Sequence, residues 1–495
     1  MKNDKRANKD ESELLEYAYA KLTEAPVLAK RRLTRVVGGN EEKLDNREFF
    51  YRIKRHVDAF IDNTASGKEN RLVLVPGLRG LGKTTALLQI YEYISETKKI
   101  DKDRILYFSA DELKDFLGGN ISDVVRIFVE GVHKNTYAAL DRQLFILIDE
   151  VHFDPNWSLS AKVIYDKADR IFMILTGSSA LGIEMGMDLA RRAKKEQAFP
   201  LSFAEFLSLK YGLRIPDEIP SNILSLLLKP TEAACRRGDA LWNEFRKKAV
   251  SIGKPLEEEF KRFLFTGGFP FCIGLDERSV YEKCFGMIER ISERDVYTVQ
   301  SFNSETRNLI TRIIYHLALQ SPGGTSDAKI SERLGASSKL VRSILDVLEK
   351  THLVFSVKPH GSAGKVLRKP WKYYFLSPSL ISSLRYKLGS LHMEDRNIFG
   401  SFAEHGVASS LFRMKELNLI PGFHYDSQEG GADFLIETGE STIPVEVGFG
   451  EKSSGQVRRS MNSYKSSHGI LVSDEEGVSF NNRIVRVPLI YFALY

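Results

Sequence analysis

The stretch Gly77-Leu-Arg-Gly-Leu-Gly-Lys83-Thr84 has a glycine, four residues and then Gly-Lys-Thr, the pattern of a phosphate-binding loop. An apolar run at 72–75 precedes it and an apolar helical pattern follows. Glycines let backbone N–H groups close around phosphate oxygens, and the following helix points its positive end at them. A chance match at a glycine-rich turn is the alternative, which the flanking runs disfavour. The predicted nucleotide-binding residues are Gly77, Arg79, Gly80, Gly82, Lys83, Thr84 and Thr85.

A second motif, Leu-Phe-Ile-Leu-Ile-Asp149-Glu150, ends an apolar run 66 residues beyond Lys83. Two adjacent acids after a strand are usually a solvated turn when they stand alone. Paired with a phosphate loop at this distance, they favour a catalytic site. We expect Thr84 and Asp149 to hold Mg²⁺, and Glu150 to polarise the water that attacks ATP. His152 receives no role, because a single loop histidine is usually structural.

Polar and basic residues follow the next apolar run, 171–176. Thr176, Ser178 and Ser179 are candidates for a contact with the γ-phosphate or the water, and Ser178 is preferred as catalytic. Arg191 and Arg192 have two equally supported interpretations. They form a solvated basic face, or one of them serves as an arginine finger to a neighbouring subunit's γ-phosphate, which would make the protein a homo-oligomer.

Short apolar runs alternate with helical patterns across this region, which predicts parallel β-α-β units and a sheet buried on both faces. The first 45 residues are highly charged and are interpreted as an arm with one helical stretch at 11–29. The pattern becomes mostly helical beyond about residue 203. The expected strands are 71–76, 104–108, 144–149, 172–176 and 198–201, and the expected helices between them are 84–97, 121–140, 158–167 and 187–195.

A third region has three helical patterns, 305–319, 327–334 and 337–350, followed by two strand-like runs, 353–358 and 371–376. This is the order of a winged helix. Its exposed basic residues suit contacts with the phosphates of double-stranded DNA. Packing against a protein partner is the alternative. The candidate DNA-binding residues are Lys339, Arg342, Arg368 and Lys369.

The motifs together resemble a prokaryotic AAA+ family, through the phosphate loop, the Asp149-Glu150 strand with its Val-His-Phe-Asp-Pro-Asn-Trp157 continuation, and Pro200-Leu-Ser-Phe-Ala-Glu-Phe-Leu207. Phe265-Thr-Gly-Gly-Phe-Pro270 resembles the lid motif of that family. The resemblance implies an α/β fold with a P-loop AAA+ parallel-sheet core, a helical lid, a winged helix and a C-terminal domain similar to PD-(D/E)xK nucleases. The implied domains are 1–45 (arm), 46–205 (ATPase core), 206–300 (lid), 301–390 (winged helix) and 391–495 (nuclease-like).

Glu404, Asp433 and Glu446 are the candidate acids of this last domain, and 13 residues separate the latter two, as in a metal-binding hairpin. The nuclease-like family has Glu-x-Lys at the second acid, where the lysine stabilises charge on the phosphate. This chain has Gly448 in that place, with Lys452 as the candidate substitute. We therefore expect weak or absent nuclease activity.

Composition excludes several classes of protein. Apolar residues make up 43% and charged residues 27%, which is ordinary globular usage. The sequence has three cysteines without zinc-ligand spacing, no apolar run of bilayer length and no signal sequence. These features predict a cytoplasmic protein without a membrane partner. The favoured function is an ATPase that uses ATP and Mg²⁺ and couples the nucleotide state to DNA or a partner. An ATPase-gated nuclease effector and a non-catalytic scaffold are the alternatives.

Overall fold

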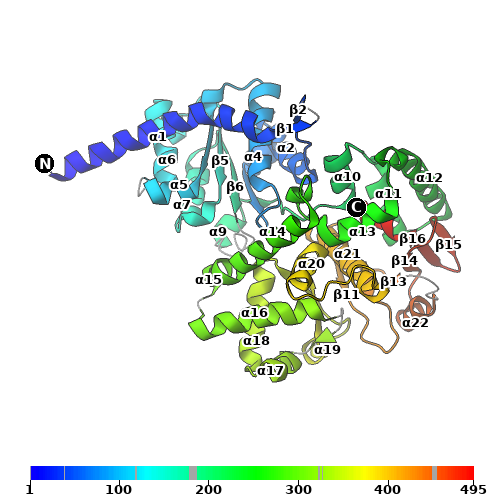
Figure 1. Ribbon diagram of the computed structural model, residues 1–495. Coiled ribbons are helices and arrows are strands. Elements are labelled where there is room, and N and C mark those ends of the chain that lie inside the picture. Colours follow the sequence, from blue (N-terminus) through cyan, green and yellow to red (C-terminus); the bar gives the residue numbers. More distant parts are fainter. Residues whose placement is uncertain are drawn as a thin grey trace. The chain divides into compact units, whose positions relative to one another are not determined.

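The computed structural model describes residues 2–37, 40–116, 120–177, 187–300, 302–320, 324–325, 327–448 and 454–495. The chain forms two compact units, residues 1–198 (unit 1) and 199–495 (unit 2) (Figure 1). None of the described helices is long and apolar enough to cross a membrane.

Among the described residues of unit 1, five parallel strands form a sheet in the order β4-β5-β6-β3-β7. Every residue of β3, β5 and β6 is buried, as expected for a parallel sheet covered on both faces. The predicted α/β fold with a parallel-sheet core is confirmed. The strands are β3 (Leu72–Pro76), β4 (Ile105–Ser109), β5 (Leu144–Asp149), β6 (Ile171–Gly177) and β7 (Lys194–Lys195).

The helices of this sheet lie largely where the apolar periodicity places them. The predicted helices 84–97 and 121–140 each begin as an α-helix and then change to one π-helical turn, at Tyr93–Thr97 and Phe128–Val132. The α-helices are α2 (Glu48–Ile61), α3 (Ala65–Glu69), α4 (Lys83–Glu92), α5 (Ala110–Phe116), α6 (Ile121–Ile127), α7 (Trp157–Lys167) and α9 (Met187–Ala190).

The fifth strand differs from the prediction. A helix at 187–195 and a strand at 198–201 are expected from the sequence, but α9 ends at Ala190 and β7 pairs Lys194 and Lys195 with β3. The hydrogen bonds from Glu196 N to Leu74 O and from Ala198 N to Pro76 O extend this pairing. The prediction failed because the edge strand consists of two exposed lysines, which carry no apolar signal. The apolar run 198–201 comes after this strand, where the chain leaves the sheet.

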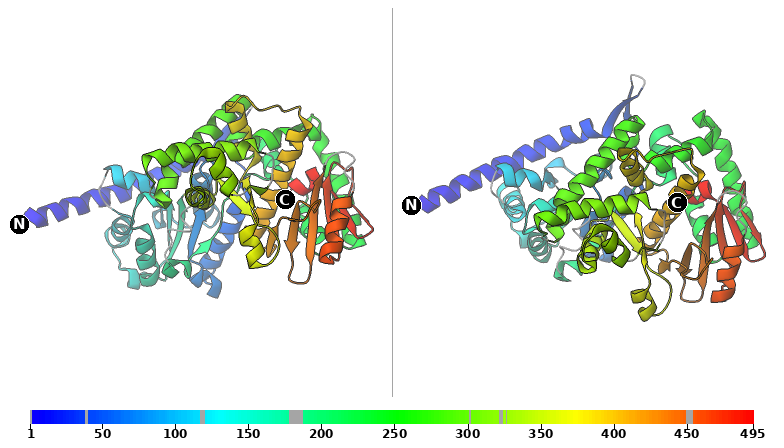
Figure 2. Two further views of the ribbon diagram at one scale, coloured as in Figure 1. Left: turned by 90° about the horizontal axis from the view of Figure 1, so that it is seen from below. Right: turned by 60° about the horizontal axis from the view of Figure 1, so that its bottom comes forward.

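The N-terminal segment is not a free arm, which corrects the prediction for residues 1–45. Helix α1 (Lys2–Leu33) contacts β4, α4 and α6, and its buried face consists of Leu14, Ala18, Ala25, Ala29 and Leu33. It therefore covers β4, the outer strand of the sheet, whose edge would otherwise be open. Three of the five residues on this buried face are alanines, so the face is hard to recognise in a sequence rich in charged residues. Figure 2 shows the first turns of α1 reaching past the helices that its later turns contact. An antiparallel pair, β1 (Thr34–Val37) and β2 (Asn40–Lys43), follows.

Unit 2 begins with helices and continues into two sheets. The predicted lid, winged-helix and nuclease-like regions lie within this one compact unit, since α13 and α14 contact α20, and α13 also contacts α21. The helices are α10 (Phe203–Tyr211), α11 (Glu218–Leu228), α12 (Glu232–Ala249), α13 (Leu256–Thr266), α14 (Glu277–Arg290), α15 (Val296–Val299), α16 (Ser304–Leu319), α17 (Asp327–Leu334), α18 (Ser338–Lys350), α19 (Ala363–Arg368), α20 (Pro378–Lys387), α21 (Arg396–Glu416), α22 (Gly455–Tyr464) and α23 (Leu489–Ala493).

The first sheet of unit 2 is antiparallel, in the order β8-β10-β9; β8 lies between α16 and α17 in the chain, and β9 and β10 follow α18. The second has the order β11-β12-β13-β14-β16-β15, in which β13, β14 and β16 are parallel. The strands are β8 (Gly324–Thr325), β9 (Val354–Val357), β10 (Trp371–Phe375), β11 (Gly422–His424), β12 (Phe434–Glu437), β13 (Thr442–Gly448), β14 (Gly469–Ser473), β15 (Ser479–Asn481) and β16 (Ile484–Pro488).

Candidate functional site: a P-loop nucleotide site

The glycine loop leaves the carboxyl end of β3 and enters α4. Gly80 and Gly82 have φ angles of 78° and 84°, a conformation that glycine adopts without strain. At Gly77, a Cβ atom would lie 3.0 Å from both the Cβ and the carbonyl oxygen of Ala198, so a side chain there would crowd Ala198. Lys83 is buried, and its Nζ donates to the carbonyl oxygens of Gly77 and Leu78 at 2.8 and 3.0 Å. The loop thus holds a buried ammonium group at the start of a helix, where phosphate oxygens bind.

Asp149, at the end of β5, is the centre of a hydrogen-bond network. The Thr84 hydroxyl donates to its Oδ2 at 2.5 Å, and the Thr176 hydroxyl donates to its Oδ1. Burial raises the pKa of Asp149, while the two hydroxyl donors oppose that shift. Hydroxyl and carboxylate oxygens are ligands that Mg²⁺ prefers. The donor set of Thr84 and Asp149 therefore fits this ion.

Glu150 follows in a left-handed backbone conformation, with a φ of 51°. Such a conformation is uncommon for a residue other than glycine and often marks a functional site. The Glu150 N–H donates to the Thr176 hydroxyl at 3.3 Å, and Oε2 lies 3.3 Å from Nδ1 of His152. Thr176 therefore fixes both the carboxylate of Asp149 and the backbone of Glu150.

The structure brings together Lys83, Thr84, Asp149 and Glu150, which the sequence predicts to form one site. The structure also places Thr176 in this site, although the sequence favours Ser178 over it. Thr176 reaches the site because its strand, β6, lies between β5 and β3. Ser178 and Ser179 lie outside the described residues.

Arg47 was missed by the sequence analysis. It is buried, and its Nη1 donates to the carbonyl oxygen of Leu81 in the glycine loop at 2.6 Å. An arginine directly before an apolar helical pattern was the only available signal. Since α2 begins one residue later, Arg47 connects this helix to the loop.

Thr176→Val is a test of the network around Asp149. Valine matches the shape of threonine but removes the hydroxyl, which leaves a buried carboxylate oxygen without its donor. We expect a loss of about 1–3 kcal/mol in the free energy of unfolding and at least a tenfold loss of ATP turnover. Thermal denaturation and phosphate release measure the two effects, with Thr136→Val at an exposed position as the control. Wild-type turnover in Thr176→Val would contradict this role.

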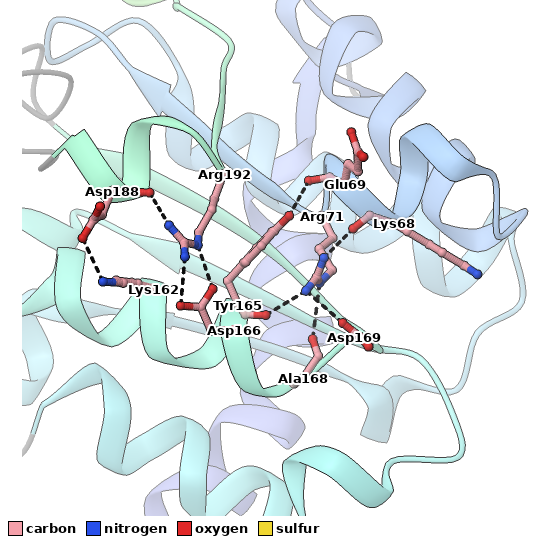
Figure 3. A network of polar contacts seen from close by, with 10 residues as sticks. All are labelled: Lys68, Glu69, Arg71, Lys162, Tyr165, Asp166, Ala168, Asp169, Asp188 and Arg192. Atoms are coloured by element: carbon pink, nitrogen blue, oxygen red, sulfur yellow. Dashed lines mark hydrogen bonds and ion pairs between the residues drawn. The ribbon is translucent and has the colours of Figure 1, made fainter.

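The arginine-finger prediction needs a correction at Arg192. Its guanidinium forms a two-point ion pair with Asp166 on α7, at 2.7 and 3.1 Å, and Nη1 donates to Asp188 O at 2.6 Å (Figure 3). A guanidinium bound in this way to its own subunit is poorly placed to reach a neighbour's nucleotide. Arg191 is exposed and stays a prediction.

Arg71 forms the second cluster in Figure 3, at the amino end of β3 and thus opposite the nucleotide loop. Its guanidinium donates to the carbonyl oxygens of Lys68, Tyr165 and Ala168, and it also pairs with Asp169 at 3.1 Å. The contacts fix the start of β3 against α7. This arginine is therefore structural.

The predicted acid cluster of unit 2 is only partly assembled. Asp433 and Glu446 lie together, since the Asp433 N–H donates to Glu446 Oε2 at 3.2 Å. Glu404 instead accepts a hydrogen bond from the Tyr374 hydroxyl at 2.7 Å, and it lines a cleft of about 910 Å³ beside Val447.

No group of three or more His, Cys, Asp or Glu side chains in the described residues could hold a metal ion. The predicted three-acid metal site is therefore corrected to an acid pair, Asp433 and Glu446. Lys452 lies outside the described residues.

Three of the four candidate DNA-binding residues, Lys339, Arg368 and Lys369, are exposed. The fourth, Arg342, differs from the prediction because its side chain is occupied within the protein. Its guanidinium stacks on the Trp371 ring at 3.6 Å and pairs with Asp327 and Asp346 at 3.3 and 3.2 Å. It therefore attaches α18 to β10 and is not available to a phosphate backbone.

A family model described as "AAA domain" matches residues 69–207, and one described as "Domain of unknown function (DUF8612)" matches 257–391. The chain is 36% identical over 455 residues to the uncharacterized protein MJ1637 of Methanocaldococcus jannaschii, covering 91% of this chain and 89% of that protein. It is 23% identical over 388 residues to an uncharacterized protein of Haemophilus influenzae, covering 76% and 82%.

Two solved structures are also similar to the chain. The Walker-type ATPase PABY2304 of Pyrococcus abyssi has a TM-score of 0.34 at 13% identity, covering 69% of this chain and 96% of that one. The ORC2 protein of Aeropyrum pernix has a TM-score of 0.29 at 12% identity, covering 70% and 100%.

Proposed function

This chain belongs to the same family as the M. jannaschii protein MJ1637 and carries an AAA domain, and on that premise we propose that it binds ATP and hydrolyses it with Mg²⁺. One observation carries the proposal: Thr84, Asp149, Thr176 and the Glu150 backbone are joined by hydrogen bonds beside the buried Lys83. A chance match at a glycine turn would not be expected to bring Thr84 into hydrogen-bond contact with Asp149, an acid at a strand end 65 residues away.

Each residue of the network has a separate task. Lys83 leaves its carbonyl contacts to bind the β- and γ-phosphates, and the loop N–H groups bind the remaining oxygens. Thr84 and Asp149 would hold Mg²⁺, which supplies charge neutralisation on the phosphates. Glu150 orients the water that attacks the γ-phosphate and accepts its proton.

The test is phosphate release from ATP by the purified chain, with Mg²⁺ and with a chelator in its place. Turnover that requires Mg²⁺ supports the proposal. Absence of both nucleotide binding and turnover would refute it.

We further propose that unit 2 couples the nucleotide state to DNA. The order α16-β8-α17-α18-β9-α19-β10, with a three-stranded antiparallel sheet, supports a winged helix. Three exposed basic residues on α18 and near β10 support contact with phosphates. Coupling to a protein partner has the same architectural support but lacks this charge argument.

The salt dependence of DNA binding tests this proposal. Replacing Lys339, Arg368 or Lys369 by alanine is expected to weaken binding to all duplex sequences alike and to lower the slope of log affinity against log salt by about one unit per lost contact. Arg342→Ala is expected to lower the melting temperature, because it removes the stacking on Trp371. Lys247→Ala, an exposed change on α12, is the control. Unchanged DNA affinity in all three variants would favour a protein partner.

The nuclease alternative has less support. Glu404, Asp433 and Glu446 do not form a three-acid metal group among the described residues, and Gly448 supplies no cation to a phosphate. An arginine finger between subunits is now proposed for Arg191 alone.

A further inference from the structure

His152, to which the sequence pattern assigns no role, lies against Glu150, the residue proposed to act on water. Nδ1 of His152 is 3.3 Å from Oε2 of Glu150. Both atoms are buried, and within the described part of the chain neither has a hydrogen-bond partner, so the pair is in contact without yet having hydrogen-bond geometry. Buried polar atoms without partners are rare and call for an explanation. The neighbouring Phe153 packs on the imidazole, with ring centroids 4.6 Å apart, and limits how far the ring can turn away.

The charge state of the imidazole determines what this contact is. Burial, together with the cations Arg79 and Lys83, lowers the pKa of His152 to about 4. The ring is therefore neutral at pH 7 and carries a single N–H. If Nδ1 bore the lone pair, it would face a carboxylate oxygen and repel it. The proton must lie on Nδ1, because the partner of each ring nitrogen selects the tautomer.

We propose that His152 is a positioning residue for the ATPase reaction: its neutral imidazole donates Nδ1–H to Glu150 Oε2 and holds that carboxylate in the orientation from which it acts on water. The inference rests on the proposed ATPase function. A neutral donor suits this task, because it orients the carboxylate without forming an ion pair that would weaken Glu150 as a base. Such hydrogen bonds are often long or poorly aligned before the substrate binds and then shorten.

Two substitutions separate positioning from packing. Phenylalanine at 152 keeps the ring contact with Phe153 but has no donor, whereas the side-chain nitrogen of asparagine takes the place of Nδ1. We expect His152→Phe to lower kcat for ATP by about 10–100-fold with KM changed less than about threefold, and His152→Asn to recover most of kcat. The matched control is His392→Phe, at an exposed position of unit 2.

A spectroscopic measurement keeps the test independent of turnover. In protein labelled with ¹⁵N-histidine, the His152 resonances are identified by their loss in His152→Asn. At pH 7 we expect Nδ1 to show the chemical shift of a protonated nitrogen and Nε2 that of an unprotonated one. In Glu150→Ala the acceptor is gone, and the tautomer should shift toward Nε2–H.

The outcomes distinguish this inference from the proposed function. If the wild type has no ATPase activity but His152 shows the Nδ1–H tautomer that depends on Glu150, the proposed function fails and the contact stands. If the wild type hydrolyses ATP but His152→Phe retains wild-type kcat, or His152 has the Nε2–H tautomer, the positioning role is overturned. A loss of nucleotide affinity equal to the loss of kcat would also overturn it, because the residue would then act on binding.

Discussion

Glu150→Gln is expected to bind ATP as the wild type does and to lose turnover by a factor of about 10²–10⁴. Glutamine keeps the size of the side chain and can still contact a water molecule, but it cannot accept the proton. Lys83 and the loop N–H groups bind the phosphates without Glu150, so ground-state affinity should change little.

The measurement combines equilibrium titration with a fluorescent ATP analogue and steady-state phosphate release. Glu41→Gln, at an exposed position on β2, removes the same charge elsewhere in unit 1 and should leave both quantities unchanged. Turnover within a factor of two of wild type in Glu150→Gln would remove Glu150 from the catalytic role.

Lys83→Met is expected to reduce ATP affinity by about a hundredfold or more. The ammonium group is already buried in the loop, so its interaction with phosphate oxygens would form in a poorly hydrated place. Hydrogen bonds to charged groups contribute about 1.5–3 kcal/mol each, and about 3 kcal/mol corresponds to roughly a hundredfold in Kd. Methionine keeps most of the side-chain volume without the charge.

The affinity loss can be measured without turnover, from the rise in melting temperature that ATP and Mg²⁺ cause in a protein that binds them. Wild type should show a rise that grows with ATP concentration, and Lys83→Met should need about a hundredfold more ATP for the same rise. Lys102→Ala, at an exposed position, is the matched control. An equal rise in wild type and Lys83→Met would contradict the assignment of the loop.

Most of the nucleotide site was predictable because its residues are local in sequence. A glycine loop, the lysine and threonine that follow it, and an acid pair after a buried strand each have their own pattern. The order of the sheet was not predictable in the same way. The place of β6 between β5 and β3 is set by long-range pairing, and only that place brings the Thr176 hydroxyl to Asp149.

Predictions from local sequence also failed where a residue makes contacts with distant parts of the chain. The charged N-terminus contains a helix whose sparse alanines cover the edge of β4, which no window of sequence reveals. Arg342 has the spacing of an exposed helix residue, but Trp371, 29 positions further on, attracts its guanidinium. Arg192 is similarly held by Asp166.

The sequence by itself determined the chemistry of the loop, because Gly80, Gly82, Lys83 and Thr84 act through backbone and side-chain properties that do not depend on distant residues. It also determined the parallel sheet, since buried runs separated by helices have few other solutions. The tertiary structure alone decided which groups share a hydrogen bond. The hydrogen bond from Thr176 to Asp149 and the contact between Asp433 and Glu446 both depend on which strands pair.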